Sequence, residues 1–223
     1  MTLDKIAKKV LPKALYQNLF LLRHLQKLAT RDGAYLVETG YIKSIINFKP
    51  INKEGNPIPW MNYSFIDFLE PRLRQSMNIF EYGSGYSTFY LSDKVSSITS
   101  VEFDRSWFEK MKGTLKGKNH CKVIYRPDKI QYIKAIEEFG NERYDLIIVD
   151  GRDRTECIKH ILPYLSEDGV VLLDDSWKTK FDMVFEFFKD NGFKELSFTG
   201  LKPGGMIVEK TTVFYRNHNV LGI

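Results

Sequence analysis

The nine residues "FEYGSGYST" at positions 80–88 decide the fold that we expect for this chain. They begin within a short apolar segment and then place two glycines, Gly83 and Gly85, before a helix-like stretch. Glycines let the backbone turn sharply and approach a ligand closely, and the amides that begin a helix attract anionic groups. In open α/β sheets, ligands bind beyond the carboxyl ends of the strands. The stretch therefore predicts a ligand-binding turn after the first strand of a sheet.

The segments that follow this turn alternate between strand-like and helix-like patterns. Such alternation predicts a parallel sheet that is covered by helices on both faces. The last two strand-like segments are separated by a glycine-bearing loop without a helix, which predicts a hairpin and an antiparallel last strand. We expect a Rossmann-like, doubly wound α/β fold with a mostly parallel seven-stranded sheet and additional N-terminal helices. The expected strands are 77–82, 97–103, 121–126, 144–150, 169–175, 194–200 and 211–216, and the expected helices are 87–94, 105–116, 129–139, 153–165 and 179–190.

The charge of the chain is concentrated at its N-terminus. Residues 1–31 hold seven basic residues and one acid, a net charge of +6, so the remaining residues contribute −1 to the total of +5. A main domain that binds nucleic acid is expected to carry a basic groove, so nucleic acid is not the expected partner. The two cysteines, Cys121 and Cys157, have no metal-like spacing and predict a reducing compartment rather than a disulfide framework.

Apolar residues in the basic N-terminal segment recur at helical spacing. They predict two helices, separated near Pro12, that are either a cover packed on the main domain or a basic element lying on an anionic membrane surface or a protein partner. No early apolar run is long enough for a signal peptide or a membrane span, so we expect a cytoplasmic protein, or one peripheral at the inner face of the membrane. A proline-rich loop suggests division into 1–59, a helical segment with its loop, and 60–223, the main domain. The apolar positions are Leu3, Ile6, Val10, Leu15, Leu19, Leu22, Leu25 and Leu28.

Two acids narrow the kind of ligand. The dinucleotide fingerprint expects a third glycine where this chain has Thr88, and it does not require an acid at the position of Glu81. A carboxylate before the turn suits a ligand with a positive charge. Glu102 ends the second expected strand 17 positions after Gly85, near the offset at which an acid accepts hydrogen bonds from ribose hydroxyls. These features favour a cationic nucleoside.

The sequence Glu81-Tyr82-Gly83-Ser84-Gly85 resembles motif I of class I S-adenosylmethionine-dependent methyltransferases, and Glu102 resembles the acid that closes their second strand. The resemblance covers residues 60–216 and includes the final hairpin that distinguishes this family's sheet from the dinucleotide fold. The segments "IPWMNY", "VDGRDR" and "VLGI" also look like a poorly characterised bacterial subgroup of these enzymes.

The resemblance implies a set of residues that bind S-adenosylmethionine. Glu81 would lie near the methionine ammonium, Glu102 would hold the ribose hydroxyls, and Phe103 would flank the adenine. Asp128 either contacts the adenine or caps the following helix. The full set is Glu81, Gly83, Ser84, Gly85, Ser87, Thr88, Glu102, Phe103 and Asp128.

Acids also follow the fourth and fifth expected strands. Asp150, Asp174 and Asp175 resemble the divalent-metal site of catechol-type and sugar O-methyltransferases, which implies Mg²⁺; the alternative is that these acids cap helices. Asp150 and Asp153 are the candidate catalytic residues, with Asp153 the better-placed general base.

The expected acceptor site combines two rims. Trp60 and Tyr63 form either a lid or part of the core, and residues 199–206 form a flexible loop on the other side. Arg152 and Arg154 bind an acidic group of the acceptor or form structural ion pairs. The sequence thus predicts methyl transfer to a small molecule or glycan, most readily at oxygen. The alternatives are an NAD-dependent oxidoreductase and a non-catalytic module that binds S-adenosylmethionine.

Overall fold

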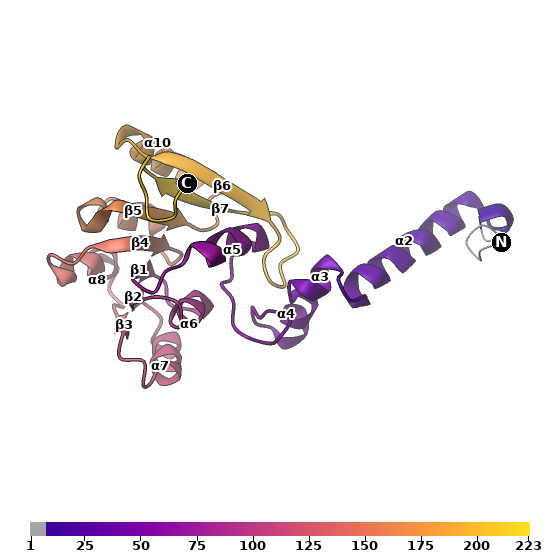
Figure 1. Ribbon diagram of the computed structural model, residues 1–223, viewed down its shortest axis with the longest axis horizontal. Coiled ribbons are helices and arrows are strands. Elements are labelled where there is room, and N and C mark those ends of the chain that lie inside the picture. The colour runs from indigo at the N-terminus through magenta and orange to yellow at the C-terminus, as the bar shows by residue number, and fades with distance from the viewer. Residues whose placement is uncertain (1–7) are drawn as a thin grey trace.

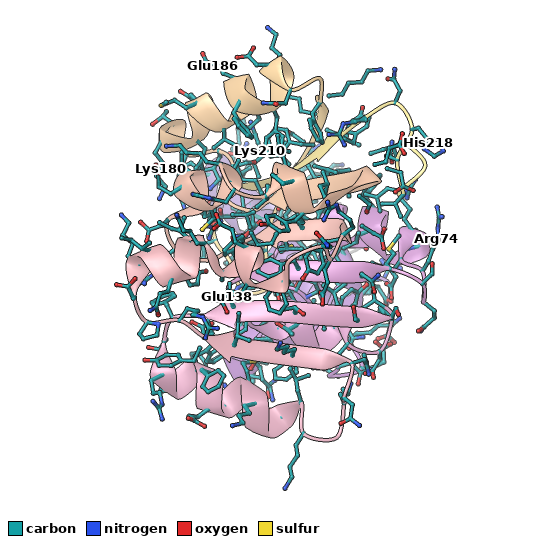
Figure 2. The ribbon with its side chains drawn as sticks, turned by 90° about the vertical axis from the view of Figure 1, so that its left-hand side faces the viewer. Arg74, Glu138, Lys180, Glu186, Lys210 and His218 are labelled. Carbon is teal, nitrogen blue, oxygen red and sulfur yellow. The ribbon has the colours of Figure 1, made fainter. Side chains whose placement is uncertain are left out.

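The computed structural model describes residues 8–223 and shows one seven-stranded sheet in that part of the chain. The strand order is β3-β2-β1-β4-β5-β7-β6, and β7 alone runs against its neighbours. The order reverses between β1 and β4, which makes the sheet doubly wound as predicted. In Figure 2 the strands lie one above another between α7 at the bottom and α10 at the top. The strands are β1 (Asn78–Tyr82), β2 (Ser97–Glu102), β3 (Cys121–Tyr125), β4 (Tyr144–Val149), β5 (Leu165–Leu173), β6 (Lys194–Gly200) and β7 (Glu209–Tyr215).

Helices cover both faces of the sheet because the central strands are apolar on both sides. In β4, Ile147 and Val149 belong to one buried cluster, whereas Leu146 and Ile148 belong to the other. Strands buried on both faces are typical of parallel sheets. The covering helices are α5 (Tyr63–Leu69), α6 (Tyr86–Leu91), α7 (Arg105–Thr114), α8 (Lys129–Ile133), α9 (Arg154–Ile158) and α10 (Asp182–Asp190), with short 3₁₀ turns η1 (Glu70–Arg72), η2 (Ala135–Phe139), η3 (Leu162–Tyr164) and η4 (Thr179–Phe181).

The N-terminal segment departs from one of its two expected arrangements. Helix α2 (Lys13–Thr30) has no buried residue, and it extends away from the sheet (Figure 1). The predicted cover over the main domain is therefore wrong for α2. Positions Leu3 and Ile6 of the first predicted helix lie outside the described residues.

Two short helices, α3 (Tyr35–Glu38) and α4 (Tyr41–Asn47), occupy a stretch in which the sequence shows no clear periodicity. They are held by tertiary contacts. The Tyr41 hydroxyl donates to the Gly205 carbonyl oxygen at 2.7 Å, which ties α4 to the β6–β7 loop. Figure 1 shows this loop descending from the hairpin toward α3 and α4. The proposed boundary between residues 59 and 60 thus separates segments that contact each other.

Neither cysteine forms a disulfide in the described part of the chain. Cys157 is fully buried, as is common for a free cysteine, whereas Cys121 is only partly covered.

Candidate functional site

A cleft of about 550 Å³ lies beyond the carboxyl ends of β1, β2 and β4, where the strand order reverses. It brings together residues that are far apart in the sequence: the turn after β1, the end of β2 and the loop after β4. A larger hollow, about 1130 Å³, lies between the N-terminal segment and helices α5 to α7, and it shares only Tyr86 with the cleft. The predicted residues that line the cleft are Trp60, Gly83, Ser84, Gly85, Ser87, Glu102, Phe103, Asp150 and Arg152.

The two glycines of the turn have different physical roles. Gly83 has φ of 94°, and a Cβ atom there would lie 2.8 Å from the backbone of Gly151. Gly83 is therefore required by the close approach of the β4–α9 loop, and not only by a ligand. Gly85 has an extended backbone, and a Cβ atom there would have no neighbour nearer than the Ser87 hydroxyl at 4.0 Å. The missing side chain of Gly85 leaves space in the cleft itself.

Glu81 does not reach the cleft. It is fully buried beneath the turn, where its carboxylate accepts hydrogen bonds from the hydroxyls of Ser87, Thr88 and Ser100. Burial raises the pKa of Glu81, although these three hydroxyls act in the opposite direction. The expected position of Glu81 beside a bound ammonium is thus not supported, because its oxygens are used to hold the turn. Thr88 shares this structural role, since it also accepts a hydrogen bond from the Gly85 amide.

Glu102 lies in the cleft and is held firmly. One carboxylate oxygen accepts from the amides of Phe103 and Asp104 at 2.8 and 2.9 Å. The other accepts from the Ser84 amide at 3.2 Å and the Ser84 hydroxyl at 2.9 Å. A hydroxyl rotates freely, so the Ser84 hydroxyl is the donor that a ribose hydroxyl can replace. This arrangement fits the nucleoside-binding role predicted for Glu102.

We expect Glu102→Ala to weaken the binding of S-adenosylmethionine by about 1–3 kcal/mol, because ribose hydroxyls would lose their charged acceptor. That loss corresponds to an increase in Kd of roughly 5- to 150-fold. Isothermal titration calorimetry measures the change directly. An unaltered Kd in a folded variant would show that Glu102 does not hold the nucleoside.

An aromatic and cationic wall closes the side of the cleft next to Glu102. The Arg152 guanidinium lies 4.6 Å from the centroid of the Phe103 ring, and Arg152 also donates to the Pro127 carbonyl oxygen at 2.8 Å. The Trp107 indole donates to the Ser84 carbonyl oxygen at 2.6 Å. These planar groups provide a stacking surface of the kind that an adenine ring needs. Arg152 is thereby placed beside the predicted adenine residue Phe103.

Asp128 has a different task. Its carboxylate accepts from the amides of Ile130 and Gln131 at 2.9 and 3.0 Å, and it does not line the cleft. This geometry supports the helix cap, one of the two interpretations that the sequence left open.

Replacement of Asp128 by alanine tests this assignment. We expect a loss of about 0.5–2 kcal/mol in the free energy of unfolding, because α8 would lose its N-cap. The Kd for S-adenosylmethionine should change less than twofold. Chemical denaturation and calorimetry on the same preparation measure the two quantities, and a large rise in Kd would instead assign Asp128 to the adenine.

The carboxylates after β4 and β5 lie close together, but cations already neutralise them. Arg154 Nη2 lies 2.9 Å from Asp150 Oδ1 and 3.6 Å from Asp175 Oδ2. Lys202 Nζ lies 2.6 Å from both Asp174 Oδ2 and Asp175 Oδ1. Despite burial, hydrogen bonds from Lys178 and Lys202 lower the pKa of Asp175. Burial, and then the neighbouring Asp174, raise the pKa of Asp150.

This cluster does not fit Mg²⁺. A magnesium ion needs free oxygen ligands at about 2.0–2.1 Å, whereas Asp174 and Asp175 are engaged by an ammonium group. Within residues 8–223, no group of three or more acidic, histidine or cysteine side chains has an arrangement suited to a metal ion. The magnesium prediction for Asp150, Asp174 and Asp175 therefore has no support.

The charged residues that follow Asp150 have different contacts. Asp153 does not line the cleft and forms ion pairs with Lys129 at 3.0 Å and Arg152 at 3.7 Å, so it is not placed as a general base. Arg154 donates to the carbonyl oxygens of Asp150 and Gly151 at 2.9 and 2.8 Å. These contacts favour the structural ion pair over acceptor binding for Arg154.

The two aromatic residues that were predicted at the rim, Tyr63 and Trp60, lie in different surroundings. Tyr63 is 3% exposed and lies in the core, where burial raises its pKa to about 12. Trp60 is half exposed and lines the cleft, and its indole donates to the Pro203 carbonyl oxygen at 3.0 Å. The two expected rims of the acceptor site are thus joined directly by Trp60.

The residues of this region that the sequence analysis did not single out include Trp107, Gly151 and Lys202. Trp107 follows the acid that caps α7, and Gly151 follows Asp150, so their neighbours gave a local signal. Lys202 gave none, because its partners are 28 and 27 positions away along the chain.

Residues 80–176 match the family described as a methyltransferase domain. A search of curated protein sequences finds no match. Among solved structures, the O-methyltransferase TomG from Streptomyces achromogenes, which contains S-adenosylmethionine, has a TM-score of 0.57 and 16% identity, with coverage of 93% of this chain and 100% of that one.

Two other structures give similar values. A putative caffeoyl-CoA O-methyltransferase from Staphylococcus aureus has a TM-score of 0.55 and 16% identity, and covers 89% of this chain and 99% of that one. An rRNA methylase from Streptococcus thermophilus has a TM-score of 0.53 and 16% identity, and covers 68% of this chain and 93% of that one. At these identities the structures establish the fold. The chain thus has the fold of these methyltransferases, and its residues 80–176 are similar to a methyltransferase domain.

Proposed function

We propose that the enzyme transfers the methyl group of S-adenosylmethionine to an oxygen atom of a small molecule or glycan, with Asp150 as the general base. The supporting observation is that the Asp150 side chain, 24% exposed, lines the same cleft as Glu102 and Gly85. The other acids of the cleft are less suited, because Glu102 and Asp104 accept hydrogen bonds from backbone amides.

The residues of the cleft divide the work of the reaction. S-adenosylmethionine supplies an electrophilic methyl group on a positively charged sulfur, so the protein needs mainly to align the acceptor. Asp150 would take the proton of the acceptor hydroxyl as the new carbon–oxygen bond forms and the carbon–sulfur bond breaks, with its electron pair passing to sulfur. Arg154 keeps the Asp150 carboxylate in a fixed orientation through its contact at 2.9 Å.

Calorimetry with S-adenosylmethionine, S-adenosylhomocysteine and NAD provides the first test. We expect micromolar-range binding of the first two ligands and none of NAD. The acceptor is then sought by incubating the enzyme with methyl-labelled S-adenosylmethionine and separate fractions of small metabolites, glycans and RNA. Label in the RNA fraction alone would reject the proposed acceptor class, and NAD binding would reject the cofactor assignment.

We also propose that α2 holds the enzyme against an anionic membrane surface. Within residues 8–223, no helix is both long and apolar enough to cross a bilayer, so the contact would be peripheral. Helix α2 contains no acidic residue, and its basic residues include Lys13 and Lys27. Basic amphipathic helices bind anionic lipid by combining apolar burial with charge attraction. The apolar residues exposed on α2 are Leu15, Leu19, Phe20, Leu21, Leu22, Leu25 and Leu28.

Vesicle flotation distinguishes this surface from a protein partner. We expect the full chain to float with phosphatidylglycerol vesicles at low salt but not with phosphatidylcholine vesicles, and to be released as added salt screens the charges. Leu19→Ser combined with Leu22→Ser should abolish flotation, whereas Ile130→Ser, at another exposed apolar position, should not. Failure of the unaltered protein to float would reject the membrane.

A further inference from the structure

Lys202 is buried at the carboxylate cluster although it comes from a loop. Its side chain is 11% exposed, which is unusual for lysine because burying an ammonium group is costly unless it is paired. The loop that carries Lys202 joins β6 to β7. It is held by hydrogen bonds from residues that precede β1 in the sequence. Trp60 donates to the Pro203 carbonyl oxygen and Tyr41 to the Gly205 carbonyl oxygen, so the residues that directly follow Lys202 are fixed.

The Lys202 ammonium bridges the two acids that follow β5. Its Nζ atom lies 2.6 Å from Asp174 Oδ2 and 2.6 Å from Asp175 Oδ1. The second oxygen of Asp174 accepts from the Thr211 hydroxyl at 2.6 Å. The Asp174 side chain is only 1% exposed, so water does not compete for these oxygens. A single cation therefore occupies the position between two adjacent carboxylates where a divalent ion would bind.

The cluster has no excess of negative charge that would attract a metal ion. Three carboxylates, from Asp150, Asp174 and Asp175, face the cations of Arg154, Lys178 and Lys202. Arg154 contacts both Asp150 and Asp175, which connects Lys202 through Asp175 to the cleft. A divalent ion added to this set would have to displace the Lys202 ammonium group from its buried partners.

We propose that Lys202 is an internal cation that takes the place of a divalent metal ion between the two carboxylates that follow β5, so that the enzyme transfers methyl groups without a metal. This inference rests on the proposed function for the role of Asp150. Lys202 is a positioning residue. It holds the carboxylates of Asp174 and Asp175, and Arg154 links the position of Asp150 to them because it contacts both Asp150 and Asp175. The acceptor rim and the carboxylates are held by the same loop.

Removal of the ammonium group should create the missing metal site. In Lys202→Ala, the oxygens of Asp174 and Asp175 lose their shared cation and become available to Mg²⁺ or Mn²⁺. We expect calorimetry to detect no divalent binding by the unaltered protein at concentrations up to about 1 mM, and to detect binding by the variant with a Kd at least tenfold lower than that limit. Addition of Mg²⁺ should raise the Tm of Lys202→Ala and leave that of the unaltered protein unchanged.

Lys178→Ala is the matched control. Lys178 Nζ also lies 2.7 Å from Asp175, but its side chain is 35% exposed and it does not touch Asp174 in the described contacts. This variant removes one positive charge from the same cluster without opening the space between the two acids. We expect no gain of divalent binding. An equal gain in both variants would indicate general charge attraction and would overturn the proposal.

Turnover and cofactor binding complete the experiment. EDTA should leave the turnover of the unaltered enzyme unchanged, and a loss that Mg²⁺ restores would overturn the proposal. Binding of S-adenosylmethionine is measured separately, so failure of the enzyme's proposed function is distinguishable from failure of the lysine assignment. If Lys202→Ala does not fold, Lys202→Gln removes the charge and retains most of the side-chain length; a folded variant that gains no divalent binding also overturns the proposal. If neither variant folds, the test is made on the unaltered protein. Divalent binding by that protein, or a loss of turnover in EDTA that Mg²⁺ restores, would overturn the proposal.

Discussion

Gly83→Ala is expected to lower the free energy of unfolding by roughly 2–6 kcal/mol. This range adds the cost of a non-glycine residue at positive φ to the cost of a steric overlap. Gly83 has φ of 94°, and the added Cβ would lie 2.8 Å from the Cα and N atoms of Gly151. Because those atoms belong to the backbone, the β4–α9 loop would have to move. Asp150 precedes Gly151, so this movement would displace the proposed base as well as the turn.

Gly85→Ala is the matched control for this prediction. The position has an extended φ of −179°, and an added Cβ would meet no atom closer than 4.0 Å. We expect its thermal unfolding to stay within about 2 °C of the unaltered protein, because no strain is introduced. Its affinity for S-adenosylmethionine should nevertheless fall, since the methyl group enters the cleft. Equal Tm values for the Gly83 and Gly85 variants would contradict the steric account of the turn.

Asp150→Asn is expected to reduce kcat by about 10²- to 10⁴-fold, the usual contribution of a general base. Asparagine has nearly the same shape but cannot accept the proton of a hydroxyl. Arg154 keeps its hydrogen bonds to the carbonyl oxygens of Asp150 and Gly151 in this variant, because these acceptors belong to the backbone. The loop should therefore hold its position, and the Kd for S-adenosylmethionine should change less than about threefold.

The measurement is the rate of S-adenosylhomocysteine formation with the acceptor found by methyl labelling. Asp153→Asn tests the other candidate general base that the sequence predicted. Asp153 is engaged by Lys129 and Arg152 outside the cleft, so we expect its kcat to change less than about twofold. A large loss of kcat in Asp153→Asn with none in Asp150→Asn would identify Asp153, and not Asp150, as the general base. Loss of cofactor binding in Asp150→Asn would assign the residue to the cofactor instead of to the acceptor.

Both predictions concern a site whose two halves are joined through tertiary contacts. Trp60, before α5, and Pro203, after β6, are linked by a hydrogen bond of 3.0 Å. Lys202 is adjacent to Pro203 and reaches the carboxylates after β5. Acceptor binding at Trp60 would therefore act on the same loop that neutralises Asp174 and Asp175. One short segment thus contacts both the proposed acceptor rim and the carboxylates that follow β5.

The sequence alone determined the sheet and the position of the cleft. Apolar strand segments, glycine turns and helix caps are local signals, and they correctly predicted the seven strands and the reversed final hairpin. Glu102 could be assigned to the cleft because its place at the end of β2 follows from its distance along the chain. The short helices α3 and α4 were missed, since contacts with the distant β6–β7 loop help to hold them.

The tertiary structure decided what each charged side chain contacts. Glu81 turned inward to three hydroxyls, Asp128 capped a helix, and Lys202 filled the space expected for magnesium. These outcomes depend on which groups are brought within hydrogen-bond distance by segments far apart in the sequence. A carboxylate has the same local sequence signal whether it binds a ligand, caps a helix or pairs with a buried ammonium. Only the packed structure supplies the partner, because the cost of burying a charge is relieved by neighbours in space rather than by neighbours along the chain.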